Sequence, residues 1–363
     1  MTQPWTVGVE QEFLLVDPQT RRPVPLAEAV ADRAGASFDV QRELTPFQIE
    51  VATPVCHSSA ELAEQVLAGR RHLAKAARAA GGALMASAVP PLGMTGPPSI
   101  TEDARYLRMQ YTHRKMLAGQ GVCGMHVHVG VPDRETAIRA SNALRPWLPS
   151  LLALSANSPV DEGQDTGYSS WRSIVWSRWP VGGPPPQLTS AGHYDALVDA
   201  LVATEVVLDP AMVYWDVRPS THVPTVEIRV ADIPLTAKDA VVIAELVRAF
   251  VRTAADSAPT EPVNDVLLRA AYWRAARDGA DGLGIDPRTG ALVPAGELLA
   301  ELLAYGEDAL RDAGAQDLVR GHLAAVAEHG GGAAKQRRAF LNGEADPADV
   351  VDLVLAETTA DIA

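Results

Sequence analysis

Cysteine is scarce in this chain, and long apolar runs are missing from it. The two cysteines, Cys56 and Cys123, cannot build a disulfide framework. No uninterrupted apolar stretch reaches the length that a membrane-spanning helix needs, and the first residues lack the basic and apolar segments of a signal peptide. We therefore expect a cytoplasmic protein that contacts no membrane.

Basic residues are also in short supply. Lysine and arginine total 31 against 45 aspartates and glutamates, so the formal net charge is -14. Proteins that bind nucleic acids or anionic membranes generally need a basic surface, so the sequence argues against both classes of partner. An anionic small molecule, held by a few local arginines or by metal ions, is compatible with this charge.

The remaining composition is that of a soluble globular protein, with 47% apolar and 21% charged residues. A chain of 363 residues can bury a substantial core and can form one domain or two. Because no compositional break marks a linker and no internal repeat is present, we predict a single domain over residues 1–363.

Hydrophobic periodicity predicts strands alternating with helices in the first part of the chain and helices almost alone after residue 236. The predicted strands are 6–16, 47–55, 83–88, 122–131, 212–218 and 225–231. The predicted helices are 59–80, 99–118, one from 134 that breaks near Pro146 and Pro149, 193–204, one from 236, 263–278, 295–312, 315–328 and 347–357. Strands first and helices later favour an α+β fold.

Residues 157–192 differ from the rest of the chain in being rich in Gly, Pro, Ser and Trp. A long irregular segment inside a compact domain is usually functional or disordered. The tryptophans Trp171, Trp176 and Trp179 argue against disorder. We interpret this segment as the wall or lid of an active site, and residues 236–363 as a helical part packed on the sheet.

Five strand-like stretches carry polar side chains of the kinds that catalyse reactions or bind metals. Residues i and i+2 of a strand point to the same face, so each stretch has one apolar face and one polar face. If these strands share a sheet, their polar faces form a single floor suited to divalent cations and a polyphosphate. The residues concerned are Glu10 and Glu12, Gln48 and Glu50, His126 and His128, Asp216 and Arg218, and Glu227 and Arg229.

Each of these patterns alone has a simpler explanation. An isolated Glu-x-Glu is more often an exposed strand face, although the strand of Glu10 and Glu12 has few of the Lys, Thr and Ser residues expected there. His126 and His128 fit ordinary polar or core histidines equally well, and no further Cys or His lies at the spacing of a zinc site. If metal binds, the oxygen-rich surroundings favour Mg²⁺ or Mn²⁺ over Zn²⁺.

The arginines likewise allow two interpretations. Glu227-x-Arg229 and Asp216-x-Arg218 are either ion pairs, worth little at a surface, or metal ligands beside arginines whose planar fork binds phosphate. A basic cluster after three consecutive glycines fits either a solvated turn or a phosphate contact. It consists of Lys335, Arg337 and Arg338.

Seven motifs together resemble the glutamate–cysteine ligase type 2 family, also described as carboxylate–amine ligases. They are Gly8–Asp17, Ile49–Cys56, Cys123–Val131, Ser155–Pro159, Asp165–Arg172, Trp215–Pro219 and Thr225–Asp232. The match extends over nearly the whole chain. This family is similar to glutamine synthetase, whose Glu-x-Glu, Gly-Met-His-x-His and Glu-x-Arg strands surround two or three divalent ions. The resemblance implies a glutamine synthetase/guanidino kinase-like catalytic domain, with a curved, largely antiparallel sheet flanked by helices and a helix-rich C-terminal part.

The resemblance also implies roles for individual residues. The implied metal ligands are Glu10, Glu12, Glu43, Glu50, His126 and Glu227. Arg229 is the implied phosphate-binding residue, and Arg172 and Arg218 are candidates to hold the substrate carboxylate or the transferred phosphoryl group. Candidate nucleotide contacts are His128, Lys335, Arg337 and Arg338. The implied cofactors are ATP and two or three Mg²⁺ ions, with Mn²⁺ as an alternative.

The reaction implied by the resemblance joins a carboxylate to an amine. ATP phosphorylates the carboxylate, expected to be the γ-carboxylate of L-glutamate. An amine such as L-cysteine then attacks the acyl phosphate, and ADP and phosphate are released. A guanidino kinase-like phosphotransferase, a metal-dependent hydrolase and a metabolite-binding protein with a decayed site stay open as alternatives. The resemblance also allows a homodimer.

Overall fold

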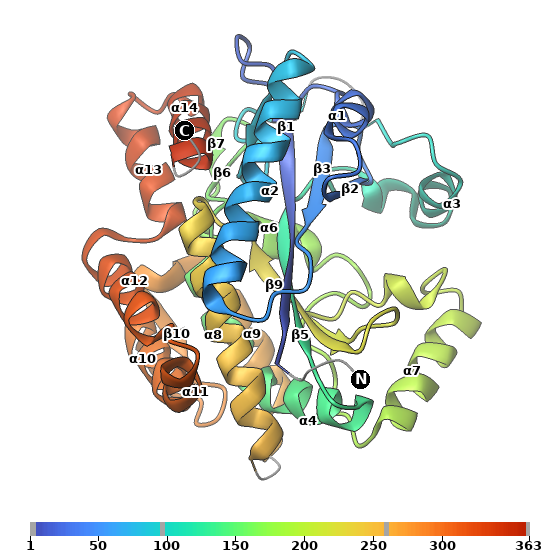
Figure 1. Ribbon diagram of the computed structural model, residues 1–363, viewed down its shortest axis with the longest axis vertical. Helices are drawn as coiled ribbons and strands as arrows, with labels where there is room; N and C mark the ends of the chain where they lie inside the picture. Colours follow the sequence, from blue (N-terminus) through green and yellow to red (C-terminus); the bar gives the residue numbers. More distant parts are fainter. Residues whose placement is uncertain (1–4, 95–98, 258–260, 361–363) are drawn as a thin grey trace.

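The computed structural model describes residues 5–94, 99–257 and 261–360, and its centre is a seven-stranded sheet (Figure 1). The strands are β1 (Val7–Val16), β2 (Asp39–Arg42), β3 (Gln48–Ala52), β4 (Ala83–Met85), β5 (Gly124–Gly130), β8 (Val217–Pro219) and β9 (Thr225–Asp232). Six of them follow in the order β2-β3-β1-β5-β9-β8, and β4 pairs with the end of β1. The neighbouring strands pair antiparallel, which confirms the predicted α+β class with its largely antiparallel sheet.

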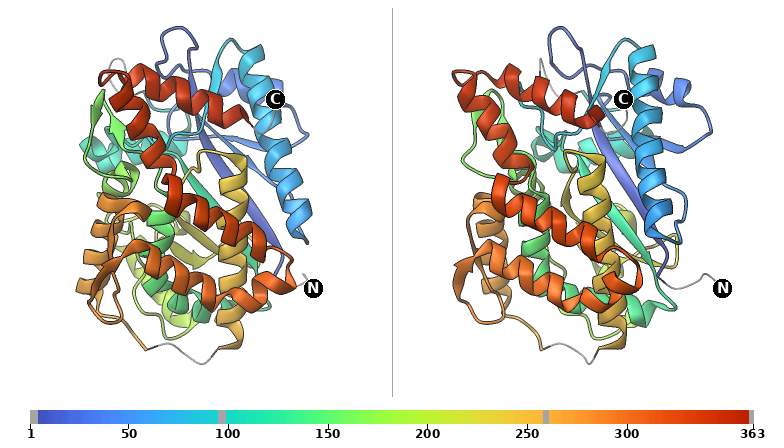
Figure 2. Two further views of the ribbon diagram at one scale, coloured as in Figure 1. Left: turned by 90° about the vertical axis from the view of Figure 1, so that its left-hand side faces the viewer. Right: turned by 60° about the vertical axis from the view of Figure 1, so that its left-hand side comes forward.

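One face of the sheet is apolar and packs against helices. Val7 and Val9 of β1 and Val127 of β5 are buried in one hydrophobic cluster with helix α8 (Ala237–Asp256). These are alternate residues of their strands, because successive side chains of a strand point to opposite faces. Each such burial stabilises the fold by about 1.5–3 kcal/mol. Two further helices complete this layer (Figure 2). They are α2 (Ser59–Ala79) and α4 (Arg134–Leu144).

The C-terminal part is helical, as predicted, and packs outside this layer (Figure 2). Its helices are α9 (Asp265–Asp278), α10 (Ala295–Tyr305), α11 (Glu307–Asp312), α12 (Gln316–His329), α13 (Gly332–Asn342) and α14 (Pro347–Ala360). Within the three described ranges, no helix is both long enough and apolar enough to cross a lipid bilayer.

Two predicted helix starts are confirmed by their capping bonds. The hydroxyl of Ser58 accepts a hydrogen bond of 3.2 Å from the backbone N–H of Glu61 at the start of α2. Thr236 and Asp239 exchange reciprocal bonds, both of 3.1 Å, at the start of α8. Each bond satisfies a backbone donor that the first helical turn leaves without a partner.

Other predicted boundaries were wrong. Helix α3 (Ala104–His113) begins later than the predicted start at residue 99, because Asp103 caps it: its carboxylate accepts a bond of 2.8 Å from the backbone N–H of Arg105. The strand predicted over 212–218 is shortened to β8. Residues 210–212 form a 3₁₀ turn instead, because Asp209 caps them through the backbone N–H of Met212.

Several short elements were not predicted. They are α1 (Ala27–Ala34), α5 (Leu148–Ser155), α6 (Trp171–Trp176), the hairpin of β6 (Val160–Asp161) and β7 (Gln164–Asp165), and the hairpin of β10 (Leu283–Ile285) and β11 (Leu292–Pro294). Strand β2 was also missed, since its side chains are mostly exposed and carry no alternating pattern. Helix α7 (Ala191–Ala203) was predicted to within two residues.

Candidate active site

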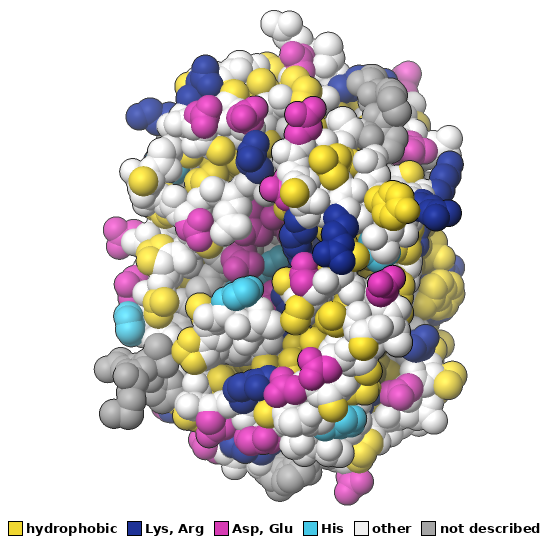
Figure 3. All heavy atoms as spheres, turned by 90° about the vertical axis from the view of Figure 1, so that its right-hand side faces the viewer, with side chains coloured by type: hydrophobic (Ala, Val, Ile, Leu, Met, Phe, Trp, Pro, Cys, Tyr) yellow, Lys and Arg dark blue, Asp and Glu magenta, His cyan; other side chains and the backbone are white. Residues whose placement is uncertain are grey.

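The sheet face opposite α2 and α8 is polar and lines a cavity of about 440 Å³. Figure 3 shows acidic and histidine side chains gathered in a hollow near the centre of this side of the molecule. The structure brings together here all the residues predicted to form the site except the basic trio of Lys335, Arg337 and Arg338. The predicted residues that line the cavity are Glu10, Glu12, Glu43, Glu50, His126, His128, Arg172, Arg218, Glu227 and Arg229.

Strand pairing creates this cluster from distant parts of the sequence. In β1, Glu12 lies opposite Glu50 of β3, and Glu10 lies opposite His126 of β5. Strand β9, on the other edge of β5, contributes Glu227. A shift of one residue in any of these registers would turn the acids into the apolar layer, so the hydrophobic pattern also fixes the site.

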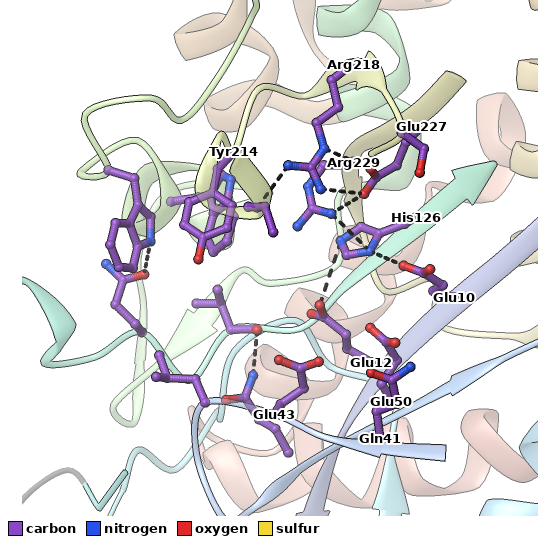
Figure 4. A pocket seen from close by; sticks show the side chains of 18 of the residues that line it. Glu10, Glu12, Gln41, Glu43, Glu50, His126, Tyr214, Arg218, Glu227 and Arg229 are labelled. Atoms are coloured by element: carbon purple, nitrogen blue, oxygen red, sulfur yellow. Dashed lines mark hydrogen bonds and ion pairs between the residues drawn. The ribbon is translucent and has the colours of Figure 1, made fainter. Parts of the chain in front are cut away.

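Ligand-type atoms meet in three groups, and within each group all of these atoms lie within 4.8 Å of one another. The groups are Glu10 with Glu50 and His126, Glu10 with His128 and Glu227, and Glu12 with Glu43 and Glu50. Figure 4 shows the carboxylates converging on one space. Because Glu10 and Glu50 each belong to two groups, cations held here would share ligands. Two of the groups combine carboxylates with one imidazole and the third has carboxylates alone, a ligand set that suits Mg²⁺ or Mn²⁺.

Two of the acids form no ion pair with a basic side chain among the described residues, and the charge of Arg229 only partly offsets their burial. Burial, together with the carboxylate of Glu12, raises the pKa of Glu43 to about 8. Burial and the neighbouring acids, led by Glu43, raise the pKa of Glu50 well above its usual range. Carboxylates crowded in this way repel one another unless protons or cations bind between them. The residues present therefore fit divalent ions.

Glu10, in contrast, has two imidazoles beside its carboxylate. Burial alone would raise its pKa, but its imidazole neighbours hold the pKa well below the usual range. Its Oε2 lies 2.7 Å from Nδ1 of His126, and its Oε1 lies 3.2 Å from Nε2 of His128. The hydroxyl of Thr225 fixes the His128 ring by a bond of 2.9 Å to Nδ1. The acid thus stays ionised, as a metal ligand must be.

Arg218 and Arg229 flank Glu227, but they differ in whether a guanidinium N–H remains available to a ligand. Arg218 donates to Glu227 over 2.8 Å and to the carbonyls of Ala211 and Val213, so it is occupied in orienting the acid. Arg229 also donates to Glu227, yet its Nε has no hydrogen-bond partner among the described residues. Although burial opposes it, these two guanidiniums hold the pKa of Glu227 well below its usual range. Arg229 therefore retains a donor for an anionic group in the cavity.

Arg172 is tied to the backbone of β9. Its guanidinium donates to the carbonyls of Arg229, over 3.2 Å, and Val230, over 3.4 Å, and lies 3.8 Å from Asp232. Gly124 leaves room for it, because a Cβ there would lie only 2.3 Å from Nη2 of Arg172. The glycine of the Gly-Met-His motif thus makes room for this arginine, whose Nε has no partner in the part of the chain that the structure describes.

The basic trio is not brought to this cavity. Lys335, Arg337 and Arg338 lie on α13, beyond the helical layer and not among the cavity's lining residues. Lys335 lies 3.3 Å from Glu357, and Arg337 lies 3.2 Å from Asp165. Their predicted role as nucleotide contacts therefore finds no support in this arrangement.

Aromatic side chains form a wall that the motifs did not reveal. Trp176, Trp179 and Tyr214 line the cavity, and their ring centroids lie 4.9 to 6.2 Å apart. Two of these belong to the tryptophan-rich segment 157–192, which was predicted to be a wall or lid. Tyr214 had no signal beyond its place just before the Asp-x-Arg motif.

Comparison with known proteins decides which family has this arrangement. A family model described as glutamate–cysteine ligase family 2 matches residues 6–353. The chain belongs to this family. It is 48% identical to a protein named as a candidate glutamate–cysteine ligase 2-1 from Saccharopolyspora erythraea, over 98% of this chain and 95% of that one. It is 47% identical to a candidate glutamate–cysteine ligase 2-3 from Mycolicibacterium smegmatis, over 98% of this chain and 99% of that one.

Solved structures share the fold at low sequence identity. The glutamate–cysteine ligase of Francisella tularensis, in complex with AMP, matches with a TM-score of 0.69 at 12% identity, over 99% of this chain and 89% of that one. A bifunctional glutathione synthetase from Pasteurella multocida matches with a TM-score of 0.69 at 16% identity, over 98% of this chain and 52% of that one. These likenesses confirm the predicted glutamine synthetase-like fold. Family membership makes the chain a ligase of the carboxylate–amine type.

Proposed function

We propose that this ligase consumes ATP and joins the γ-carboxylate of L-glutamate to the amine of L-cysteine or of another amine. The observation that supports this most is the convergence of three carboxylate-rich groups on one cavity beside Arg229, which has a donor to spare. A carboxylate is a poor electrophile, so phosphorylation must activate it before an amine can displace phosphate. Mg²⁺ held by these acids would supply the charge that neutralises the phosphates.

Within this proposal each side chain has a task. Glu10, Glu12, Glu43, Glu50, His126, His128 and Glu227 would hold the ions. Arg229 would stabilise the phosphoryl group, because a preorganised guanidinium is effective in a water-poor site. Arg218 and Arg172 would act indirectly. Arg218 orients Glu227, and Arg172 fixes the backbone of β9. The aromatic wall would exclude water, which would otherwise hydrolyse the acyl phosphate.

The test is release of ADP from ATP and Mg²⁺ with glutamate and a panel of amines that includes cysteine. We expect release to need both the carboxylic acid and the amine, and a new amide to appear in equal amount. A phosphorylated product that persists without any amine would indicate a phosphotransferase instead. Turnover without nucleotide would indicate a hydrolase.

A further inference from the structure

Arg105 lines the active-site cavity but belongs to none of the sequence motifs. Four arginines and no lysine among the described residues line this cavity. Arg172 and Arg218 are bound to backbone carbonyls and to Glu227, and Arg229 is assigned to the phosphoryl group. Arg105, on helix α3, therefore remains available for another anionic group of a substrate.

The guanidinium of Arg105 is held in place and still has a nitrogen without a partner. Its Nε and Nη2 donate to the two carboxylate oxygens of Asp209 over 3.2 and 3.4 Å. Asp209 is itself fixed, because it accepts a bond of 3.2 Å from the backbone N–H of Met212. Nη1 of Arg105 has no partner in the described ranges, and the side chain is 42% exposed. A ligand that enters the cavity from solvent can therefore contact this guanidinium.

Helix α3 is attached to the segment that carries one of the acids. The hydroxyl of Thr101, just before α3, donates to the carbonyl of Glu43 over 2.6 Å. The hydroxyl of Tyr106 donates to the carbonyl of Arg42 over 3.4 Å. Arg105 thus lies on the side of the cavity that holds Glu43, whose ligand group consists of carboxylates alone. Figure 3 shows basic side chains beside the acidic hollow.

Tyr214 is close to both Arg105 and Arg229. The guanidinium carbon of Arg229 lies 5.9 Å from the ring centroid of Tyr214. Burial raises the pKa of the Tyr214 hydroxyl to about 12, and the positive charges of Arg105 and Arg229 oppose this rise. The two guanidiniums therefore act on one aromatic side chain of the same cavity.

A substrate with two carboxylates needs a cation for the one that does not react. Five glutamates line the cavity, so they would repel a second substrate carboxylate that no cation held. Arg105 offers that cation away from the metal-type groups, none of which includes a residue of α3. Because Asp209 offsets part of its charge, this guanidinium suits one carboxylate better than the several charges of a polyphosphate.

We propose that Arg105 selects the carboxylate donor by binding its second carboxylate, the α-carboxylate of glutamate, and that Asp209 positions Arg105 for this contact. The donor then lies with its reacting carboxylate toward the metal-type groups and Arg229, and with its other carboxylate toward α3. This assignment rests on the proposed function, because it names the group that recognises the acid to be activated.

The test measures ADP release from ATP and Mg²⁺ with hydroxylamine as the amine, which is small enough to need no binding site of its own. The donors are glutamate and its α-amide, which has the same shape without the negative charge. For the wild type we expect a kcat/KM for glutamate at least about tenfold above that for the amide, because a bond between charged groups is lost. In Arg105→Met the preference should fall to about twofold or less.

The kinetic constants of Arg105→Met distinguish binding from catalysis. We expect the KM for glutamate to rise about tenfold while kcat stays within about threefold, because Arg105 does not touch the reacting carboxylate. Arg108→Met is the matched control, since Arg108 is an exposed arginine of the same helix that does not line the cavity. It should leave the KM for glutamate unchanged.

Asp209→Asn tests the positioning role. An amide can still accept the bond from Met212, but it no longer holds Arg105 by charge. The KM for glutamate should rise about two- to fivefold, and adding Asp209→Asn to Arg105→Met should raise it no further. A further rise in the double variant would show that Asp209 acts on the fold and not through Arg105.

Failure of the proposed function and failure of this assignment give different results. No ADP release by the wild type with any carboxylic acid would overturn the proposed function. Release that is equally efficient with glutamate and its α-amide would overturn the role of Arg105 without any variant. A raised KM for ATP or for cysteine in Arg105→Met, with an unchanged KM for glutamate, would assign this arginine to another substrate and would also overturn it.

Discussion

At the scale of single residues, the site combines acids in opposite states. Glu10 is held ionised by two imidazoles, whereas Glu43 and Glu50 are crowded by like charges. A divalent ion would reduce the repulsion around Glu43 and Glu50, and it would bind the ionised carboxylate of Glu10 directly. Glu10 and Glu50 each join two of the three ligand groups, and Glu10 is the one of the two that is held ionised, so its loss should affect ion binding strongly.

We therefore expect Glu10→Gln to lower kcat for ADP release by at least about 100-fold, because an amide is a weaker ligand that keeps the same shape. The variant should stay folded, but the thermal midpoint of its metal-free form should fall, because His126 and His128 lose their carboxylate partner. The control is Glu64→Gln, at an exposed position of α2. Activity of Glu10→Gln within a few fold of wild type would refute the proposed metal role.

At the scale of elements, one buried arginine joins α2, β1 and the segment before α8. Nε of Arg70 donates to Oε1 of Gln11 over 2.8 Å. Its terminal nitrogens donate to the carbonyls of Pro234, over 2.8 Å, and Leu235, over 3.1 Å. This explains why a polar residue interrupts the apolar face of β1, which the strand pattern alone could not.

Gln11→Leu should lower the free energy of unfolding by about 1–3 kcal/mol, because Arg70 loses its buried hydrogen bond to Oε1 of Gln11. Arg70→Met removes all three of these bonds and should cost more, about 3–5 kcal/mol. Urea denaturation measures both losses. Since Gln11 faces away from the cavity, the folded variants should keep the wild-type KM for ATP, and a Gln11→Leu protein as stable as wild type would contradict the account.

The basic trio lies on a helix that the hydrophobic periodicity did not predict. Three consecutive glycines indicate a turn, and Gly330, with φ of 75°, does end α12. The next helix starts at once, at Gly332, so the three basic residues lie on α13. A glycine run indicates where a helix stops, but the position of the following helix depends on packing against other elements.

At the scale of the whole molecule, the cluster of acids links stability to pH and to metal. A pKa near 8 for Glu43 in the folded protein, against an ordinary 4.5, means that the fold holds this proton more tightly than the unfolded chain does. The resulting stability is fully present below about pH 4.5 and is lost as the pH rises toward 8. Mg²⁺ competes with this proton, so its effect should grow over the same range.

We expect Mg²⁺ to raise the thermal midpoint more at pH 8 than at pH 6, and the metal-free protein in EDTA to be less stable at pH 8. Differential scanning calorimetry across this range measures both trends. The same Mg²⁺ effect at pH 6 and pH 8 would show that the acids do not take up the protons that their burial implies.

The sequence by itself determined most strands of the sheet, their two faces and the kinds of side chain on them, because a period of two residues is a local property of the backbone. The motifs around Glu10, His126 and Glu227 were enough to indicate the family. Only the tertiary structure decided which residues meet. It fixed Arg218 on Glu227, placed the basic trio on α13 and left both the trio and Asp216 out of the cavity's lining. Strand order, register and helix packing decide this, because they depend on contacts between residues far apart in the chain.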